Sequence, residues 1–284
     1  MHIGFSFFWQ FVLGLPNPNK AEFWHIAIPD IDQALINFKQ YGVQSIELKL
    51  TEKADVQQIS AAIHKLMGNG FYVTFHAPSR FHYPDDLSWQ LQTIYHISEF
   101  VISTYKFTPM WIIHPLNSTH KNRTVLFQQT LEYLQQILTE LQDVPARFAL
   151  EILRNRENSA KLHLGDNYEE ILEILTNVHA ENLGICWDFG HTYAMHQRGL
   201  QQQFPPVEFL NQVVHCHVHD CLDQKTHLPL GHGEISIQES IQLLKSCGYD
   251  GILNLEFVPH RIDDPLNFIK YVKQSVFLIS ELIQ

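Results

Sequence analysis

The sequence predicts an α/β fold made of a single (β/α)8 TIM barrel, and three observations carry this prediction. Short apolar runs rich in β-branched and aromatic residues alternate with segments of helical spacing along the whole chain. We count eight such runs, and eight parallel strands joined by right-handed crossovers close a barrel. The length of 284 residues suits this fold, which typically takes roughly 250 residues. An open doubly wound sheet is the alternative, but no G-x-G-x-x-G motif follows the first run.

Each apolar run is predicted to form one strand of the barrel. The runs are His2–Phe7, Ser45–Leu50, Phe71–Ala77, Met110–Pro115, Phe148–Leu153, Leu183–His191, Val213–Asp220 and Ile252–Pro259. The predicted helices between them are Asp30–Tyr41, Ala54–Met67, Leu87–Thr104, Thr124–Leu141, Asn167–Val178, Ile237–Ser246 and Pro265–Leu282. Asp30 and Ser236 are typical helix N-caps, and Gly42, Gly68 and Gly248 are typical helix stops.

The composition predicts one domain spanning residues 1–284. At 45% hydrophobic and 17% charged residues the chain can bury an ordinary core, and no linker or low-complexity tract marks a second domain. With 19 Lys and Arg against 30 Asp and Glu, the net charge of −11 argues against a nucleic-acid partner, although one local basic groove is compatible with it.

Cysteine usage and hydropathy predict a cytoplasmic protein without a membrane partner. The cysteines are Cys186, Cys216, Cys221 and Cys247, which form no C-x-x-C motif, and no secretory leader is visible. A reducing cytoplasm is therefore the simplest compartment. The apolar stretch Phe5–Leu15 is too short to span a bilayer.

A long apolar connection, Phe8–Pro29, separates the first predicted strand from the first predicted helix. It carries Trp9, Phe11, Pro16, Pro18, Phe23 and Trp24. This segment could pack over the barrel mouth, act as a lid, or form the contact of a homodimer, and the sequence leaves these three roles open.

Histidine, with 18 residues, is the outlier of the composition, and polar residues gather at one end of the predicted strands. The C-terminal ends of the strands face the active site in a barrel of this kind. From the third run onward every run delivers His, Asp or Glu at that end. These residues are His76, His114, Glu151, Asp188, His191, His215, His217, His219, Asp220 and Glu256.

This constellation predicts a divalent metal. A carboxylate such as Glu151 or Glu256 inside an apolar strand costs several kcal/mol unless it is paired or bound to a metal. Mixed carboxylate and imidazole ligands suit Zn, Mn, Co or Fe. Taken singly, His76 or His114 could be a hydrogen-bonded core histidine, and either glutamate could pair with an arginine such as Arg154. The set as a whole favours the metal site.

Three histidines alternate at positions 215, 217 and 219, so they share one face of a strand. We expect one of them to ligate a metal and the others to contact substrate or to support a ligand. The thiol of Cys216 alternates away from them and is expected to be inert.

These residues, in this order, resemble the xylose isomerase-like barrel superfamily, which includes sugar-phosphate isomerases and epimerases and the endonuclease IV branch of apurinic-site nucleases. The most specific parts are the D-x-x-H motif at 188–191, the H-x-H-D motif at 217–220, the H-x-P-L-G-x-G motif at 227–233, and the glutamate of the eighth strand. The resemblance covers nearly the whole chain.

The resemblance implies a metal held by Glu151, Asp188, His217 and Glu256. In the isomerase and epimerase members the two glutamates double as acid and base on either side of the substrate, and His191 would contact a substrate oxygen. We expect His219, Lys225 and His227 to complete the substrate-binding set. The identity of the metal stays open among Mn, Zn, Co, Mg and Fe.

In the endonuclease branch two further metals appear. One is held by His76 and His114 with a bridging Glu151, so the resemblance keeps a second metal site open here. The other uses His191, His227 and an aspartate two residues before the latter, where this chain has Lys225. A protonated ammonium cannot ligate a cation, so no third metal is expected unless the loop shifts and brings in Asp223.

The predicted function is that of a metal-dependent isomerase or epimerase, acting on a small sugar, sugar phosphate or hydroxy-ketone through an enediolate. An endonuclease IV-like metallo-phosphodiesterase is the alternative: His76 and His114 favour it, whereas Lys225 and the net charge count against it. Another metal-dependent hydrolase or lyase also stays open. For a phosphorylated substrate, Arg80, Arg154 and Lys225 are candidate anion contacts.

Overall fold

Eight parallel strands close into a barrel in the computed structural model, which describes residues 1–15, 21–51, 55–78, 83–119, 122–157 and 159–284. The strands are β1 (His2–Phe8), β2 (Ser45–Lys49), β3 (Tyr72–His76), β4 (Met110–Ile113), β6 (Arg147–Glu151), β8 (Leu183–Asp188), β9 (Val213–Val218) and β12 (Ile252–Leu255). Their order around the barrel is β1-β12-β9-β8-β6-β4-β3-β2, and each neighbouring pair is parallel. The predicted single (β/α)8 barrel is therefore confirmed.

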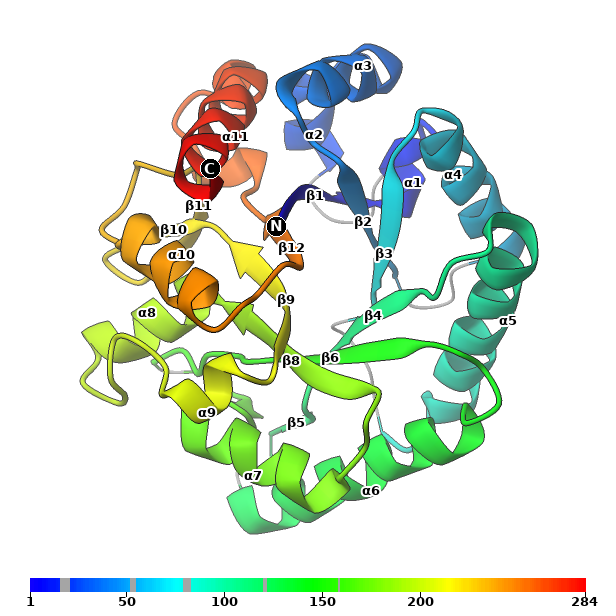
Figure 1. Cartoon of the computed structure of the whole chain (residues 1–284), viewed down its shortest axis with the longest axis vertical. Coiled ribbons are helices and arrows are strands. Elements are labelled where there is room, and N and C mark those ends of the chain that lie inside the picture. Colours follow the sequence, from blue (N-terminus) through cyan, green and yellow to red (C-terminus); the bar gives the residue numbers. More distant parts are fainter. Residues whose placement is uncertain (16–20, 52–54, 79–82, 120–121, 158) are drawn as a thin grey trace.

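Helices surround this ring of strands, as Figure 1 shows. The longer ones are α3 (Ile31–Tyr41), α4 (Val56–Gly68), α5 (Leu87–Tyr105), α6 (Arg123–Glu140), α7 (Tyr168–Val178), α8 (Phe189–Gln197), α10 (Ile237–Ser246) and α11 (Phe268–Ile283). The shorter ones are α1 (Trp9–Val12), α2 (Ala21–Ala27), α9 (Val207–Leu210) and the 3-10 turns η1 (Pro259–Arg261) and η2 (Pro265–Asn267). No helix in the described ranges is both long and apolar enough to cross a bilayer.

Two small antiparallel sheets lie outside the barrel. One pairs β5 (Asn117–Ser118) with β7 (Leu162–His163), and the other is the hairpin of β10 (Asp220–Leu222) and β11 (Lys225–Leu228). Both belong to connections that follow the C-terminal ends of barrel strands. They therefore shape the end of the barrel where an active site is expected.

The caps support most of the predicted helix ends. Asp30 caps α3 by accepting a hydrogen bond from the backbone N–H of Gln33, and Gly42 ends that helix in a left-handed conformation. Ser236 stands at the N-cap of α10, but its side chain makes no capping hydrogen bond. The predicted start of the second helix, Ala54, lies outside the described residues.

Several predicted strands were too long at their C-terminal ends. The run 252–259, for example, is a strand only over Ile252–Leu255, and the turn η1 begins at Pro259. The run 183–191 ends as a strand at Asp188, and the next three residues open α8. The cause is local: the carboxylate of Asp188 accepts a hydrogen bond from the backbone N–H of His191 at 2.7 Å, which caps the helix. The run 213–220 likewise ends at Val218, because Asp220 begins the hairpin.

The long apolar connection after β1 contributes to the core. Trp24 of α2 is 4% exposed, and its ring lies 5.4 Å from that of Phe268 and 5.8 Å from that of Phe7. Phe11 is also buried against Trp24. The described part of this connection thus packs between β1 and the C-terminal helix, whereas Pro16 and Pro18 lie outside the described residues.

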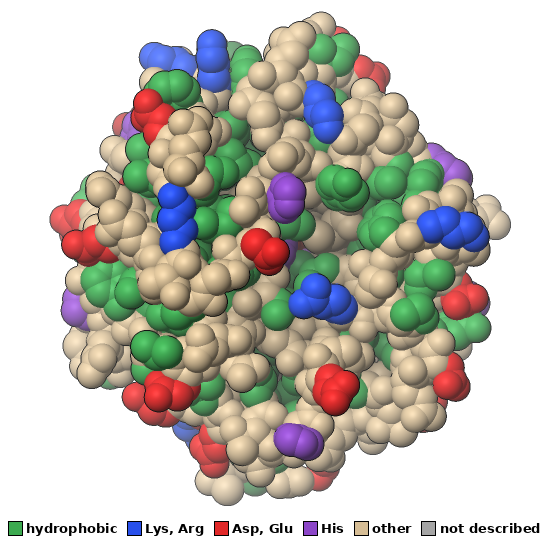
Figure 2. All heavy atoms as spheres, viewed as in Figure 1, with side chains coloured by type: hydrophobic (Ala, Val, Ile, Leu, Met, Phe, Trp, Pro, Cys, Tyr) green, Lys and Arg blue, Asp and Glu red, His purple; other side chains and the backbone are tan. Residues whose placement is uncertain are grey.

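Charged side chains are dispersed on the face that Figure 2 shows. Lys and Arg are scattered among Asp and Glu there, and they do not gather into one basic patch. This distribution agrees with the acidic composition of the chain.

Candidate metal centre

The alternation of side chains along the strands builds the site. Ile112, Ala149 and Cys186 form a small apolar cluster apart from the main core, which packs between strands and helices. Two residues further along each of these strands the same face carries a polar side chain. The last inward positions of the eight strands, in barrel order from β1, are Phe8, Glu256, His217, Asp188, Glu151, His114, His76 and Lys49. One end of the barrel is therefore lined by ionisable groups.

The four ligands implied by the resemblance come together. Glu151, Asp188, His217 and Glu256 each offer one ligand atom, and these atoms all lie within 4.8 Å of one another. The Nδ1 atom of His217 lies 3.0 Å from Glu256 Oε2, 3.6 Å from Glu151 Oε1 and 3.9 Å from Asp188 Oδ2. All four side chains are buried.

The protonation of His217 shows that this cluster suits a cation. Its Nε2 lies 3.0 Å from Glu47 Oε2 and donates a hydrogen bond to it, so a neutral ring carries a lone pair on Nδ1. Within the described residues, His217 Nδ1 and Glu256 Oε2 are buried atoms without a hydrogen-bond partner. Burial lowers the pKa of His217, but the neighbouring Cys186, Glu256 and Glu47 outweigh it and raise the pKa well above its usual value, so without a cation the ring is protonated and positively charged. A divalent cation would take the place of that charge between the carboxylates and bind the lone pair of Nδ1.

Both glutamates of the cluster are ionised near neutral pH. Burial raises the pKa of Glu151, but His114 and His217 outweigh it and hold the pKa well below its usual value. Burial likewise raises the pKa of Glu256, but His217 and Lys49 hold it well below its usual value. Each carboxylate is therefore able to bind a cation or to accept a proton.

A second group of ligand atoms shares Glu151. His76 Nδ1 lies 2.7 Å from the carbonyl of Ala77 and donates to it, so its Nε2 carries the lone pair. That Nε2 lies 3.2 Å from Glu151 Oε2 and 3.2 Å from His114 Nε2, and His114 Nε2 lies 2.7 Å from the same carboxylate oxygen. The distances among these three atoms are close to the distances between neighbouring ligand atoms around a tetrahedral metal ion with bonds of about 2.1 Å. Glu151 is thus placed to bridge two cations.

Glu47 is a site residue that the sequence analysis missed. It is fully buried inside the barrel and accepts hydrogen bonds from His215 Nε2 at 3.1 Å, His217 Nε2 at 3.0 Å and Ser6 Oγ at 3.0 Å. Burial raises its pKa, but His217 and His215 outweigh this effect and the pKa lies below its usual value. Since both its oxygens are engaged, Glu47 orients His217 rather than offering a ligand atom.

Lys49 was missed as well. Its ammonium forms an ion pair with Glu256 at the last inward position of β2. Burial lowers the pKa of Lys49, but Glu256 and Glu47 outweigh it and raise the pKa, so the amine stays charged. The sequence could have indicated both residues. Glu47 and Lys49 are two positions apart in β2, so their side chains lie on the same face, which points into the barrel.

His219 supports its neighbours from a buried position. Its Nε2 donates to Asp188 at 3.1–3.2 Å, and its Nδ1 accepts the backbone N–H of His227 at 3.0 Å. Gly190 approaches the ring so closely that a Cβ at this position would collide with it. Although ligand atoms of His191, His219 and His227 lie within 4.8 Å of one another, both ring nitrogens of His219 are engaged, so this trio does not fit a third metal.

Of the other predicted substrate-binding residues, two reach the cavity and one does not. His191 and His227 line the cavity, and the Nδ1 of His227 donates to the carbonyl of Glu256 at 3.1 Å, which leaves its Nε2 free to face the cavity. Lys225 and Asp223 are exposed on the hairpin and are not among the lining residues. Arg80 lies outside the described residues.

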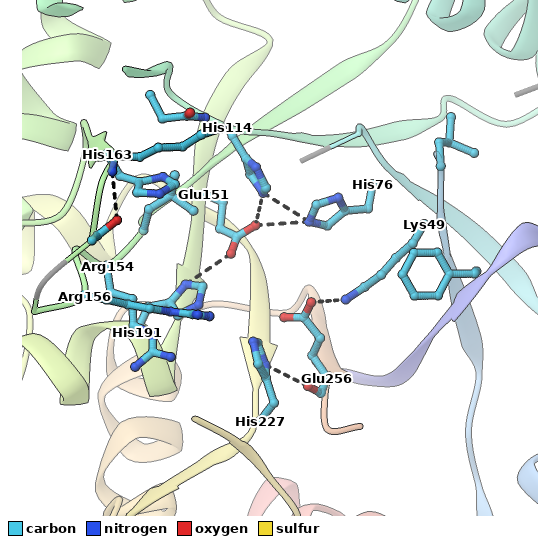
Figure 3. Close-up of a pocket in the computed structure, with 16 residues that line it drawn as sticks. Lys49, His76, His114, Glu151, Arg154, Arg156, His163, His191, His227 and Glu256 are labelled. Atoms are coloured by element: carbon cyan, nitrogen blue, oxygen red, sulfur yellow. Dashed lines mark hydrogen bonds and ion pairs between the residues drawn. The ribbon is translucent and has the colours of Figure 1, made fainter. Parts of the chain in front are cut away.

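A cavity of about 400 Å³ opens above the clusters, a volume within the range of small-molecule sites. Of the four clustered ligands, the two glutamates reach it, whereas Asp188 and His217 lie fully buried beneath. Figure 3 shows Glu151 between His114, His76 and His191, with Lys49 beside Glu256. The lining of the cavity also includes Arg154, Arg156, Lys161 and His163.

Comparisons with known proteins agree with this geometry. A family model described as "Xylose isomerase-like TIM barrel" matches residues 36–272. A solved D-tagatose 3-epimerase-like protein is 19% identical, with full coverage of both chains and a TM-score of 0.69. A solved D-psicose 3-epimerase from Clostridium cellulolyticum H10 is 14% identical, with 100% of both chains covered and a TM-score of 0.67. At sequence identities this low, the structural similarity shows that the fold is shared.

A curated relative, an uncharacterized protein of Methanocaldococcus jannaschii, is 28% identical over 155 residues. The match covers 51% of this chain and 49% of that protein, so it spans about half the length of the curated relative.

Proposed function

We propose that this chain, which belongs to the xylose isomerase-like TIM barrel family, is a divalent-metal-dependent isomerase or epimerase of a small sugar, sugar phosphate or hydroxy-ketone. The observation that carries the proposal is that two ionised glutamates, from strands separated by two others, face one cavity above a buried cation-binding cluster. The 3-epimerase names of two structural neighbours support the same chemistry.

The metal would be held by Glu151, Asp188, His217 and Glu256. When bound there, it supplies a Lewis acid that polarises a carbonyl oxygen and stabilises the negative charge that develops on it.

The two glutamates carry the proton transfer. One carboxylate takes the proton from the carbon next to the substrate carbonyl, and the electron pair of that C–H bond passes to the carbonyl to give an enediolate. The same glutamate or its partner returns a proton to the neighbouring carbon or to the opposite face. Proton transfer on both faces of the substrate needs a carboxylate on each side of it. Glu151 at the end of β6 and Glu256 directly after β12 supply these two carboxylates.

Other side chains of the cavity orient the substrate. The ammonium of Lys49 and the ring of His191 can donate hydrogen bonds to substrate oxygens, since both line the cavity. Phe8, Leu50 and Leu153 add apolar surface to its wall, which limits the access of water to the reacting carbon.

Substituting the glutamates tests this proposal. We expect Glu151→Gln and Glu256→Gln each to lower kcat by about 10²–10⁴-fold, because an amide cannot accept the proton. The measurement is the exchange of substrate hydrogen for deuterium in heavy water during isomerisation of ketoses and ketose phosphates. Glu239→Gln, on the exposed face of α10, is the matched control. Full activity in both cavity variants would contradict the mechanism.

A metallo-phosphodiesterase is the second candidate function, and the group of His76, His114 and Glu151 favours it because two bridged cations can clamp the attacking and leaving oxygens of a phosphodiester. Elemental analysis separates the two functions. About one metal per chain with isomerase activity supports the first, whereas two per chain with cleavage of an abasic DNA duplex supports the second.

A further inference from the structure

The segment between β6 and α7 concentrates positive charge at the cavity. Its Arg154, Arg156 and Lys161 all line the wall, together with His163. Figure 3 shows both arginines on the same side of Glu151 as His163 and His191, away from Lys49 and His76. In a chain of net charge −11, this local excess of cations needs a reason.

Within the described ranges, no acidic side chain forms an ion pair with any of these three cations. The guanidinium of Arg154 donates to the backbone carbonyl of Gln224 at 2.7 Å, and neither Arg156 nor Lys161 forms an ion pair there. Glu157 follows Arg156 directly, is exposed, and forms no ion pair with these cations within the described residues. Asp166 and Glu170, further along the chain, are paired with Arg123 of α6.

Arg261 of η1 approaches the same group. Burial and the nearby charge of Arg156 lower the pKa of Arg261, and its Nε is buried without a hydrogen-bond partner in the described structure. Burial, followed by the charge of Arg156, lowers the pKa of Arg154 to about 10. Three guanidinium groups therefore lie close enough to repel one another, and a bound anion would relieve that repulsion.

The segment that carries these cations is held in place. The side chain of Asn155 donates to the carbonyl of His163 at 2.7 Å and accepts its backbone N–H at 2.7 Å. The β7 strand of the segment pairs with β5, and Arg198, the C-cap residue of α8, donates to the carbonyl of Asn155. The backbone that carries the cations is thus fixed before a ligand arrives, which lowers the entropic cost of binding it.

We infer that Arg154, Arg156 and Lys161 form a subsite for the phosphate monoester of a phosphorylated sugar. The inference rests on the proposed function, because it places the remote phosphate of that substrate on the wall beside Glu151. Guanidinium groups match the oxygens of a phosphate dianion with paired hydrogen bonds, and several cations together suit a dianion better than a single carboxylate.

Binding of inorganic phosphate tests the subsite without any turnover. Calorimetric titration is carried out on the metal-loaded protein and on the chelated protein, so that phosphate bound to a metal is counted separately. We expect Arg154→Gln and Arg156→Gln each to raise the dissociation constant for inorganic phosphate about tenfold in the chelated protein. Arg147→Gln, at the opposite end of β6, is the matched control and should bind as the wild type does.

Steady-state kinetics then compare ketose phosphates with the corresponding free ketoses. We expect the two arginine substitutions to raise KM about tenfold for the phosphorylated substrate and to leave KM for the free ketose nearly unchanged. Equal phosphate binding in all variants, no binding by the chelated wild type, or equally tight binding of gluconate would overturn the subsite. Inactivity of the wild type on every ketose, with phosphate binding still dependent on the arginines, would overturn the isomerase proposal and leave the subsite standing.

Discussion

At the scale of single residues, the tautomer of His217 decides whether the cluster can hold a cation. Glu47 accepts the Nε2 proton of His217 and thereby turns the lone pair of Nδ1 toward Glu151, Asp188 and Glu256. A histidine without that partner can flip its proton to Nδ1, where it blocks a metal.

We therefore expect Glu47→Gln to weaken metal affinity about 10–100-fold while the barrel still folds. The amide can accept one hydrogen bond from His215 or His217 but loses the negative charge that favours the required tautomer. Competition with a fluorescent chelator measures the affinity, and circular dichroism checks the fold. Wild-type affinity in a folded Glu47→Gln protein would show that this carboxylate does not orient the ligand.

His163 predicts a dependence of stability on pH. Burial, with smaller effects from His114 and His191, lowers its pKa from 6.5 to about 4. Since the folded pKa lies below the unfolded one, the unfolded chain takes up the proton first as pH falls below about 6.5. The stability present above that pH is therefore lost between about pH 6.5 and 4.

Replacing His163 by Gln should make the fall in Tm between pH 7.5 and 5 smaller than in the wild type. His96→Gln, on the exposed face of α5, should leave that fall unchanged. Thermal unfolding followed by circular dichroism at both pH values provides the comparison. An equal fall in wild type and His163→Gln would mean that this ring does not contribute.

The sequence located most of the candidate centre because its polar residues interrupt apolar runs at strand ends, where a buried charge stands out. Glu47 and Lys49 escaped notice for a physical reason: they alternate with Ile46 and Leu48 in a short strand, and that pattern is also typical of an ordinary half-exposed strand. Their burial depends on closure of the barrel, which one strand cannot reveal.

At the scale of elements, the carboxylate of Asp220 organises the connection after β9. It accepts backbone N–H groups from Cys221, Gly231, Gly233 and Ile235 at 2.9–3.1 Å. A Cβ at Gly233 would collide with this carboxylate, so glycine is needed for the close approach. The hairpin and the 227–233 turn are thereby tied together, and His227 is held at the cavity.

Asp220→Asn should loosen this connection, because an amide offers one acceptor oxygen in place of two. We expect the free energy of unfolding to fall by about 1–3 kcal/mol, with faster proteolysis near residues 222–234. Asp223→Asn, exposed on the same hairpin, is the control. Unchanged proteolysis and stability in Asp220→Asn would contradict an organising role.

The helix α8 shows why an element boundary was misjudged. The predicted strand continued through the D-x-x-H motif to His191, yet the spacing of this motif is that of an N-cap residue and the N–H that it binds. Asp188 performs both tasks, since one oxygen caps the helix and the other faces the cluster. Apolar content alone does not separate the end of a buried strand from the start of a buried helix.

At the scale of the whole molecule, the sequence predicted the barrel because strands buried on both faces appear as continuous apolar runs. The small sheets β5–β7 and β10–β11 could not be predicted, because strands of two to four residues carry no periodic signal. The family resemblance read from the motifs is confirmed by the family model. The net charge said less about the ligand of the cavity, because the sum of −11 over the whole chain does not reveal that Arg and Lys side chains gather on one cavity wall.

The candidate metal centre also joins distant parts of the chain. Its ligands lie on or beside β6, β8, β9 and β12, four consecutive strands of the closed barrel, so one cation would tie together half of the ring. Without it, three buried carboxylates face one another across a few ångströms, which destabilises the folded state.

Removing the metal should therefore lower the stability of the whole barrel. A cation at 100 times its dissociation constant stabilises the folded state by about 2.7 kcal/mol, which corresponds to about 4–5 °C in Tm for a chain of this size. We expect a chelator to lower Tm by that amount, and added Mn²⁺ or Zn²⁺ to restore it in a concentration-dependent way. Asp188→Asn should respond less to both, because the substitution removes a ligand charge. A Tm that responds neither to chelator nor to added Mn²⁺ or Zn²⁺, in protein that elemental analysis shows to take up no metal on titration, would contradict the metal centre and the mechanism built on it.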